Sequence, residues 1–355
     1  MSFEFANPIG ETLSQPALIA LARHTEAPLE VRRLLASSAS RLTDSSMIIE
    51  EEFHPFKDVG ESRVRNPLPQ PDVLHAIRAL IEDVRKSGFG PHAARFFGLL
   101  GSVMIDLSGT DAQKARVQGW VDAGLTACFA MTDRGGPLAH QWLSEISTDT
   151  PPRLTVNKVW SMNANRSDFG IVIVRQGKSM VMAPVLVPPE EFAKAETCQS
   201  GPSFLDGHLP LGDVKLTIEQ ANPDWVLRTG GPISSKVFLS LARPFLIQAL
   251  VAHARWLVDQ QRLNLDKTGS VALEFLSQAA RNQSAKKYFD KHSEDQAMAL
   301  KWVANETWLH LVVNGLVSGQ DDARDLISLT KMEGSSYRCF FEIYQRNKRF
   351  RDVAT

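Results

Sequence analysis

The hydrophobic period changes twice along the chain, and this constrains the fold more than any other feature. Residues from about 15 to 125 place apolar side chains at three- and four-residue spacing, which is typical of helices. Segments between about 125 and 227 are short, β-branched or apolar, and bounded by Gly, Pro, Asn and Asp, which predicts strands. From about 234 onward the helical period returns. Helices on both sides of a run of strands predict segregated layers, hence an α+β fold.

The predicted elements divide the chain into three domains. We expect an N-terminal helical domain over 1–125, a small barrel- or sandwich-like β-domain over 126–228, and a C-terminal bundle of long helices over 229–355. The segment 234–263 is apolar nearly all round, so it predicts a central helix buried on several sides. Two further long helices are predicted over 294–319 and 323–345, and 176–178 predicts a hairpin turn between two strands.

Composition narrows the class of protein. With 355 residues, 43% apolar and 22% charged, the chain is typical of a soluble globular protein. A net charge of −1 gives no electrostatic reason to bind nucleic acid or an anionic membrane, and the N-terminal stretch lacks the apolar segment of a signal peptide. Cys128, Cys198 and Cys339 are too widely spaced for a metal site or a disulfide framework. We therefore expect a cytoplasmic protein without a bound metal.

The stretch from Leu154 to Val174 contains an unusual interruption. Its apolar alternation is broken by Lys158, Trp160 and Asn163, where a plain surface strand would continue. Two interpretations follow from these residues alone. The stretch is either an ordinary hairpin with Trp160 in the core between sheet and bundle, or a strand end shaped around a flat aromatic ligand.

Five segments together resemble the acyl-CoA dehydrogenase family. Each is a short piece, and they occur in the family's order and spacing over roughly residues 100 to 345. They are "GTDAQKARVQGWVDAGLTACFAMTDRGG", "NKVWSMNA", "GDVKLTIEQANPDWVL", "ARPFLIQALVAHARWLVDQQR" and "ARDLISLTKMEGSS".

The resemblance implies a reaction and a cofactor. In that family the β-domain and the C-terminal helices enclose FAD and an acyl thioester. A glutamate removes the α proton while the β hydrogen leaves as hydride to the flavin. The thioester carbonyl must be polarised by hydrogen bonds as charge develops, a positioned carboxylate takes the proton, and the flavin carries the redox chemistry.

The resemblance also assigns residues to the cofactor. Trp160 would close one side of the isoalloxazine ring, and Thr132 with neighbouring backbone N–H groups would bond the flavin pyrimidine. Arg262 would lie on the adenine side. Gly135 and Gly136 would form an anion-binding turn, with a simple loop as the alternative. The remaining implied cofactor contacts are Met131, Ser161, Met162, Asn163 and Gln345.

Three positions depart from the family pattern. The run "RGGPL" at 134–138 lacks the family's serine and aspartate, which contact the thioester carrier. Met162 stands where a hydroxyl usually bonds flavin N5, and a thioether cannot donate. Losing one such bond costs on the order of 1 kcal/mol. The Phe-Gly pair that follows the adenine-side arginine is missing after Arg262.

The catalytic base has one candidate, Glu333, and the segment around it can be aligned with the family pattern in two registers. Glu333 in "MEGSS" imitates the family's Glu-Gly-Thr turn. In the other register Lys331 and Gln345 belong to the preceding bundle helix, the chain stops before the usual base, and Glu333 is an exposed helical glutamate. Some family members place the base just before an arginine of the first bundle helix. Here Ala254 precedes Arg255, which keeps only a supporting role.

Three functions are compatible with these residues. The first is an FAD-dependent dehydrogenase of an acyl thioester carried by coenzyme A or a carrier protein. The second is a non-catalytic subunit of the same fold that pairs with an intact paralogue. The third is a flavin-dependent oxygenase on the same fold, which needs no α-proton base. The resemblance implies a dimer or tetramer packed through the C-terminal bundle.

Overall fold

The structure is a computed structural model that forms two compact units. One unit comprises Met1–Arg65 and Leu239–Thr355, and the other comprises Asn66–Phe238. The described residues are 27–42, 71–136, 139–178, 181–199, 203–227, 233–286, 289, 291–332, 334–336, 338–340 and 342–343. Each unit is considered by itself, and the expected division into three domains stays a prediction.

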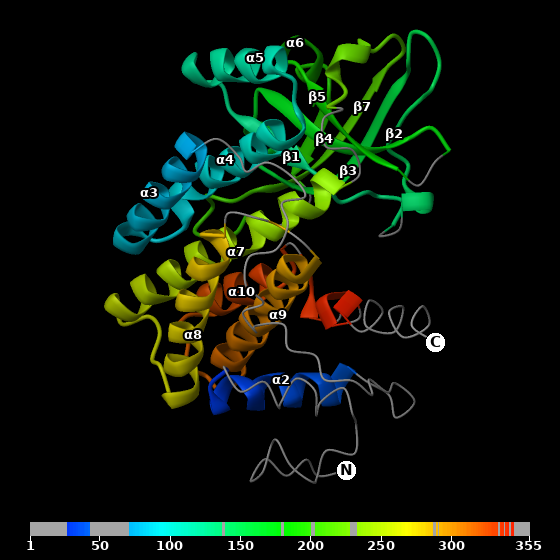
Figure 1. The fold of residues 1–355 in the computed structure, drawn as a ribbon. Helices are drawn as coiled ribbons and strands as arrows, with labels where there is room; N and C mark the ends of the chain where they lie inside the picture. The colour runs from blue at the N-terminus through cyan, green and yellow to red at the C-terminus, as the bar shows by residue number, and fades with distance from the viewer. Residues whose placement is uncertain are drawn as a thin grey trace, which may run out of the picture. The chain divides into compact units, whose positions relative to one another are not determined.

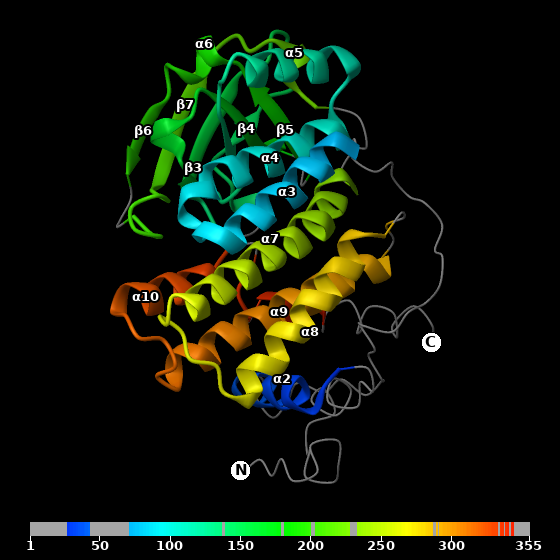
Figure 2. The same cartoon turned by 90° about the vertical axis from the view of Figure 1, so that its left-hand side faces the viewer.

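Three helices open the second unit, as the sequence predicts. They are α3 (Pro71–Ser87), α4 (Gly90–Ser108) and α5 (Asp111–Asp122). Helix α4 packs against α3, beside which it lies in Figure 2, and it also packs against the first strand. Helix α5 begins with a capping box in which Thr110 and Gln113 exchange side-chain to backbone hydrogen bonds. The contact of α4 with the first strand holds these helices on the sheet that follows.

A mixed sheet of seven strands forms the rest of this unit, so the predicted α+β class is confirmed. The antiparallel pairing of β4 with β5 places the predicted turn at 176–178 between them. Strands β2 and β6 were not predicted, since runs of two and four residues are too short to show a period. The strands are β1 (Ala127–Ala130), β2 (Glu145–Ile146), β3 (Leu154–Met162), β4 (Phe169–Gln176), β5 (Met182–Val187), β6 (Glu196–Gln199) and β7 (Leu211–Ile218).

Strands β1 and β2 are two halves of one interrupted strand. Both pair in parallel with β4: Ala127–Ala130 lies opposite residues 169–172, and Glu145–Ile146 lies opposite residues 175–176. The chain therefore leaves the sheet after Ala130 and returns to the same line at Glu145. Figure 1 shows β1, β4, β2 and β3 together in this unit. Several residues with predicted cofactor roles lie at this break.

The sheet curls around a single apolar cluster. Val185 and Val187 of β5 and Val214 and Leu216 of β7 belong to the same buried cluster, although these strands lie toward opposite ends of the sheet. Phe192, from the short helix α6 (Pro189–Phe192), closes on this cluster. A flat sheet could not bring both ends into one core, so the apolar packing itself requires the curl.

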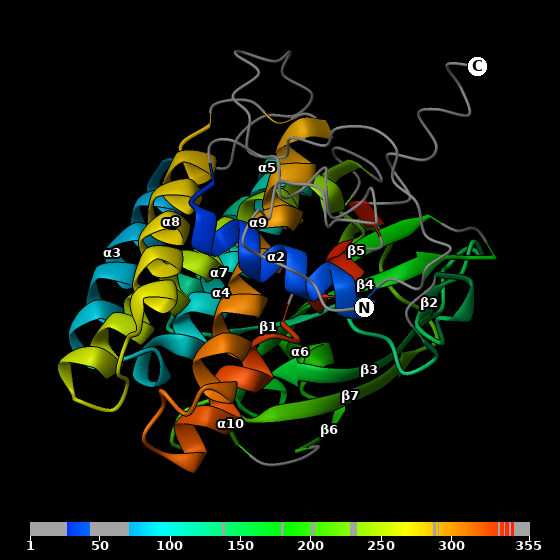
Figure 3. The ribbon, with the colours of Figure 1, turned by 90° about the horizontal axis from the view of Figure 1, so that it is seen from below.

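Helices build the first unit. Helix α2 (Leu29–Leu42) packs across α8 (Lys267–Ser284) and α9 (Lys291–Val313), which Figure 3 shows from below. The indole N–H of Trp302 donates to Ser38 Oγ at 2.8 Å, which ties α9 to α2. Trp302 and Trp308 are fully buried in this unit. Helix α8 was not among the predicted helices.

Helix α7 (Ile233–Asp259) is the predicted apolar central helix. Phe245, Leu246 and Ile247 are fully buried, in agreement with an apolar surface all round. Among the described residues, Val237–Asp259 is long and apolar enough to cross a bilayer by length and composition, and 89% of its most apolar window is buried. The buried core helix of a soluble protein meets the same criterion, so this is weak grounds for a membrane span.

The long helix predicted over 323–345 is wrong in its length. Helix α10 (Gln320–Leu329) ends at Leu329, whose carbonyl accepts a hydrogen bond from the buried Lys301 ammonium at 3.2 Å. The Asn305 amide donates to the Gly334 carbonyl at 3.0 Å, and Gly334 has a φ of +120°. Two polar side chains of α9 therefore hold a non-helical turn where the apolar period alone predicts a continuous helix.

Two glycines give a matched test of this packing. A Cβ on Gly170 of β4 would lie 2.7 Å from the Phe192 ring, whereas a Cβ on Gly98 of α4 meets nothing within 4 Å. We expect Gly170→Ala to lower the free energy of unfolding by about 1–3 kcal/mol through overpacking. Gly98→Ala should raise it by about 0.5–1 kcal/mol. Urea denaturation checks both, and equal effects at the two sites would contradict the assigned close contact.

Candidate functional site

The candidate site lies where the chain leaves the sheet between β1 and β2. Thr132 is exposed, and its carbonyl accepts a hydrogen bond from the Val159 N–H at 3.0 Å. Two residues on, the Arg134 N–H donates to the Asn157 carbonyl at 3.1 Å. Residues 132–134 therefore continue beside β3 before the loop departs, which brings the Thr132 side chain into the neighbourhood of the β3 bulge.

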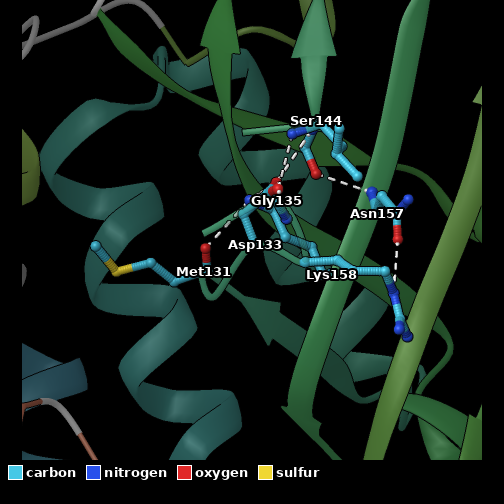
Figure 4. A network of polar contacts seen from close by, with 8 residues as sticks. Met131, Asp133, Gly135, Ser144, Asn157 and Lys158 are labelled. Carbon is cyan, nitrogen blue, oxygen red and sulfur yellow. Dashed lines mark hydrogen bonds and ion pairs between the residues drawn. The ribbon is translucent and has the colours of Figure 1, made fainter. Parts of the chain in front are cut away.

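The Asp133 carboxylate closes the loop at its base. Its Oδ1 accepts hydrogen bonds from the backbone N–H groups of Gly135 at 2.9 Å and Leu143 at 2.8 Å. Its Oδ2 accepts the Ser144 N–H at 3.1 Å. Figure 4 shows these bonds converging on the carboxylate. One buried side chain thus joins the point where the chain leaves the strand to the point where it returns.

Lys158 of β3 neutralises this carboxylate inside the protein. Its ammonium lies 3.1 Å from Asp133 Oδ2, donates to the Met131 carbonyl at 3.1 Å, and lies 4.2 Å from the centre of the Trp142 ring. Both charged side chains are fully buried. Because a buried cation needs a carboxylate partner, the position of Lys158 within an apolar strand pattern was the sequence signal that a partner was needed, and the structure identifies Asp133 as that partner. The sequence does not reveal that Trp142 completes the group.

Burial and pairing act oppositely on the two members of this pair. Burial pushes the pKa of the Asp133 carboxyl upward, but the hydrogen bonds it accepts and the Lys158 charge outweigh burial, so its pKa lies below the usual range. Burial lowers the pKa of the Lys158 ammonium to about 8, although Asp133 opposes that shift. The pair is therefore ionised at neutral pH, and Lys158 is its more easily neutralised member.

Trp160 projects from a bulge in β3. The register of β3 against β7 shifts between Lys158 and Ser161, and Trp160 has a φ of +54° with 65% of its surface exposed. Trp160 is therefore not a core residue of this unit. A large aromatic residue in the left-handed region is strained by about 1–3 kcal/mol. The strained backbone and the exposed indole of Trp160 are therefore not explained by packing in this unit.

The residues after Trp160 return to the interior. Ser161 and Asn163 are buried, and neither Ser161 Oγ nor Asn163 Oδ1 has a hydrogen-bond partner among the described residues. Asn163 is in the left-handed region with a φ of +55°, and its N–H donates to the Pro210 carbonyl at 3.0 Å. Met162 is half-buried. Unpaired buried oxygens of this kind cost about 1–3 kcal/mol each and mark a segment not optimised for stability alone.

The ring end of a flavin fits what this segment offers. Within the described residues, no hydrogen bond engages the Thr132 N–H, the Thr132 hydroxyl or the Met131 N–H. An indole exposed beside unpaired donors suits a planar heterocycle that presents carbonyl and ring-nitrogen acceptors. When bound there, a flavin would supply the capacity to accept two electrons and a proton.

The Gly135–Gly136 turn does not form an open anion cradle. The Gly135 N–H is already used by Asp133. A Cβ on Gly135 would lie 1.9 Å from the Gln141 carbonyl oxygen, and a Cβ on Gly136 would lie 2.5 Å from Gln141 Oε1. The glycines are therefore needed for close contact with the returning loop, in agreement with the loop interpretation.

The predicted arginines are engaged inside their own units. Arg262 binds both oxygens of Asp322, at 2.8 and 2.6 Å, and lies 5.3 Å from the Trp256 ring centre. The Arg255 guanidinium is paired with Glu274 at 2.7 Å, and Ala254 before it is fully buried. Glu333 and Gln345, the predicted base and bundle glutamine, lie outside the described residues. The structure thus brings together the β-domain residues, from Met131 to Asn163.

The sequence matches no family model and no curated protein. Solved structures do match in fold. A butyryl-CoA dehydrogenase from Megasphaera elsdenii shares 14% identity with a TM-score of 0.58, over 99% of this chain and 100% of that chain. A glutaryl-CoA dehydrogenase from Mycobacterium smegmatis, in complex with FADH2, shares 15% identity with a TM-score of 0.54, over 78% and 94% of the two chains.

A third matching structure is named for an acyl carrier protein and not for coenzyme A. The prolyl acyl carrier protein oxidase AnaB shares 14% identity with a TM-score of 0.52, over 77% of this chain and 83% of that chain. Similarity at this level of identity shows the fold and nothing finer. The chain therefore has the fold of the acyl-CoA dehydrogenases, as the five sequence segments indicate.

The buried pair predicts a pH-dependent stability. Lys158 titrates near pH 8 when folded and near its ordinary 10.5 when unfolded. Between these values the unfolded chain holds the extra proton, so the Lys158 contribution to stability increases with pH, by at most about 1.4 kcal/mol per pH unit. Urea denaturation of the wild type and Lys158→Met from pH 7 to 10.5 checks this. Their difference should move in favour of the wild type, and a constant difference would contradict the lowered pKa.

Proposed function

We propose that the protein is a flavoprotein that oxidises an acyl thioester to its α,β-unsaturated product. The acyl group is carried by coenzyme A or a carrier protein, and hydride passes to FAD. The fold, shared with acyl-CoA dehydrogenases and with an acyl carrier protein oxidase, supports this general chemistry. A cytoplasmic location and assembly as a dimer or tetramer are parts of the same proposal.

The observation that carries the proposal is the state of Trp160. Its backbone is strained, its indole is exposed, and it follows Val159, which bonds the Thr132 carbonyl beside donors that have no partner among the described residues. Strained residues persist where the surroundings impose them and cluster at ligand sites. A flat heterocycle would cover the indole and satisfy the donors, which supports a ring-binding role for both residues.

Different residues of the chain have separate roles in the proposed reaction. The Asp133–Lys158 pair holds the Met131 carbonyl and the loop base, which fixes the direction of the Thr132 N–H because both groups belong to one peptide plane. Trp160 provides an aromatic wall that orients a ring and keeps water from one of its faces. Glu333 is the candidate that takes the α proton of the thioester. Arg255 of α7 is held by Glu274 and is assigned a supporting role without direct contact.

A second candidate function is a non-catalytic subunit that pairs with an intact paralogue. Specific observations favour it. Met162 cannot donate to a flavin, Ala254 is buried and leaves the alternative base position without a carboxylate, and Arg255 is already paired. The two functions differ in whether the purified chain takes up flavin and accepts hydride from an acyl thioester.

Two substitutions of Trp160 test the ring-binding role. Titrating FAD into the purified protein should quench flavin fluorescence, and both Trp160→Ala and Trp160→Gly should weaken binding by about tenfold or more. Trp160→Gly should also be about 1–2 kcal/mol more stable than Trp160→Ala, because glycine removes the strain of a positive φ. If the wild-type protein leaves the fluorescence of added FAD unquenched, this result would refute the flavoprotein and favour the non-catalytic subunit.

The base is tested by flavin reduction without oxygen. In an FAD-loaded protein that is reduced by a short-chain acyl-CoA, Glu333→Gln should slow bleaching of the flavin about 10²–10⁴-fold. Glu82→Gln, an exposed glutamate of α3, is the matched control and should leave the rate unchanged. Equal rates in the wild type and Glu333→Gln would exclude Glu333 as the base.

A further inference from the structure

Three groups of the described residues that could contact the anionic tail of a flavin are each engaged with a carboxylate of their own unit. We infer that this chain binds a flavin through its ring and not through its adenosine diphosphate tail, so that riboflavin, FMN and FAD bind with similar affinity. The inference rests on the proposed flavin function and concerns which part of the ligand is recognised. It depends only on contacts inside each unit.

Arg134, at the loop base, is the first such group. Its guanidinium pairs with Asp213 of β7 through Nη2, and its Nε donates to Asn157 Oδ1 at 3.2 Å. The Asp213 side chain is only 13% exposed, and its Oδ1 has no partner among the described residues. If Arg134 turned to a phosphate, Asp213 would be left buried without its cation. That loss exceeds the gain from an exposed phosphate contact.

Arg262, the predicted adenine-side arginine, is bound more completely. Two parallel hydrogen bonds join its Nε and Nη2 to the two oxygens of Asp322, and the Asp322 side chain is 9% exposed. The guanidinium also lies over the Trp256 ring. A fork geometry of this kind is the most stable form of an arginine pair. The net charge of the pair is zero, so it does not attract a diphosphate.

The glycine turn gives the third case. Its Gly135 N–H donates to the Asp133 carboxylate, which is itself an anion, and the space beside both glycines is occupied by Gln141. A phosphate at this turn would meet the like charge of Asp133 with its N–H donor already used. By contrast, Thr132 and Trp160 are neutral and exposed. Among the described residues with predicted cofactor roles, those left for a ligand are the ones that recognise an uncharged ring.

A ligand series separates ring recognition from tail recognition. Intrinsic flavin fluorescence is titrated with the full chain using riboflavin, FMN and FAD, at about 20 and 300 mM salt, a range over which screening changes strongly. We expect the three dissociation constants to agree within about threefold, with little salt dependence. ADP at millimolar concentration should not displace riboflavin. FAD binding at least a hundredfold tighter than riboflavin, or displacement of flavin by micromolar ADP, would overturn the inference.

An isosteric substitution that removes one negative charge tests the reason. Asp213→Asn keeps the shape of the side chain and leaves Arg134, in the same unit as Trp160, with an uncompensated positive charge, so FAD should gain about tenfold in affinity while riboflavin is unchanged. Asp149→Asn, at an exposed carboxylate of the same unit, is the matched control and should change neither. An unchanged ratio of FAD to riboflavin affinity in Asp213→Asn would refute the assignment of Asp213 as the group that withholds Arg134.

The outcomes distinguish this inference from the proposed function. If FAD binds far more tightly than riboflavin, the flavoprotein stands and the ring-only inference fails. If none of the three flavins binds, the flavoprotein fails and the inference fails with it. Thermal unfolding is measured beside each titration and shows whether a variant is folded. Loss of binding by an unfolded variant is therefore not mistaken for loss of the binding site.

Discussion

The buried ion pair of Asp133 and Lys158 is the interaction on which the candidate site depends. A carboxylate that accepts three backbone N–H groups and one ammonium joins the two ends of the loop between β1 and β2. Removing one member of such a pair leaves a buried charge unpaired, which typically costs about 3–5 kcal/mol. The pair is therefore a weak source of net stability and a strong constraint on local geometry.

The consequence of this constraint is a strand that stops and restarts. The interruption leaves donors at Met131 and Thr132 without partners in the described residues. The adjacent strand β3 contains a bulge at which Trp160 is exposed. Sheets normally satisfy their backbone groups and bury their large aromatic side chains. Here both rules are relaxed at neighbouring positions, which is what a site prepared for a flat ligand requires.

Charge is distributed differently from what the resemblance implies. The arginines and the glycine turn that resemble anion contacts are bound to carboxylates of their own unit. These carboxylates are buried, so the pairs exchange poorly with an external phosphate. Fold and electrostatics thus point to different parts of one cofactor: the fold supports a flavin, and the local pairing selects its uncharged end.

The sequence by itself determined the type and order of most of the long elements, because hydrophobic period is a local property, and it missed α8 and the short strands β2 and β6. It predicted α3, α4, α7 and the long strands, and the resemblance of five short segments predicted the fold. Only the tertiary structure decided that β1 and β2 form one broken strand, that Trp160 is exposed, and that α10 ends at Leu329. Each of these depends on residues distant in sequence, since Lys158 finds Asp133 and Lys301 finds Leu329 only after folding. A charged residue in an apolar pattern shows that a partner is needed, and the fold alone chooses which one.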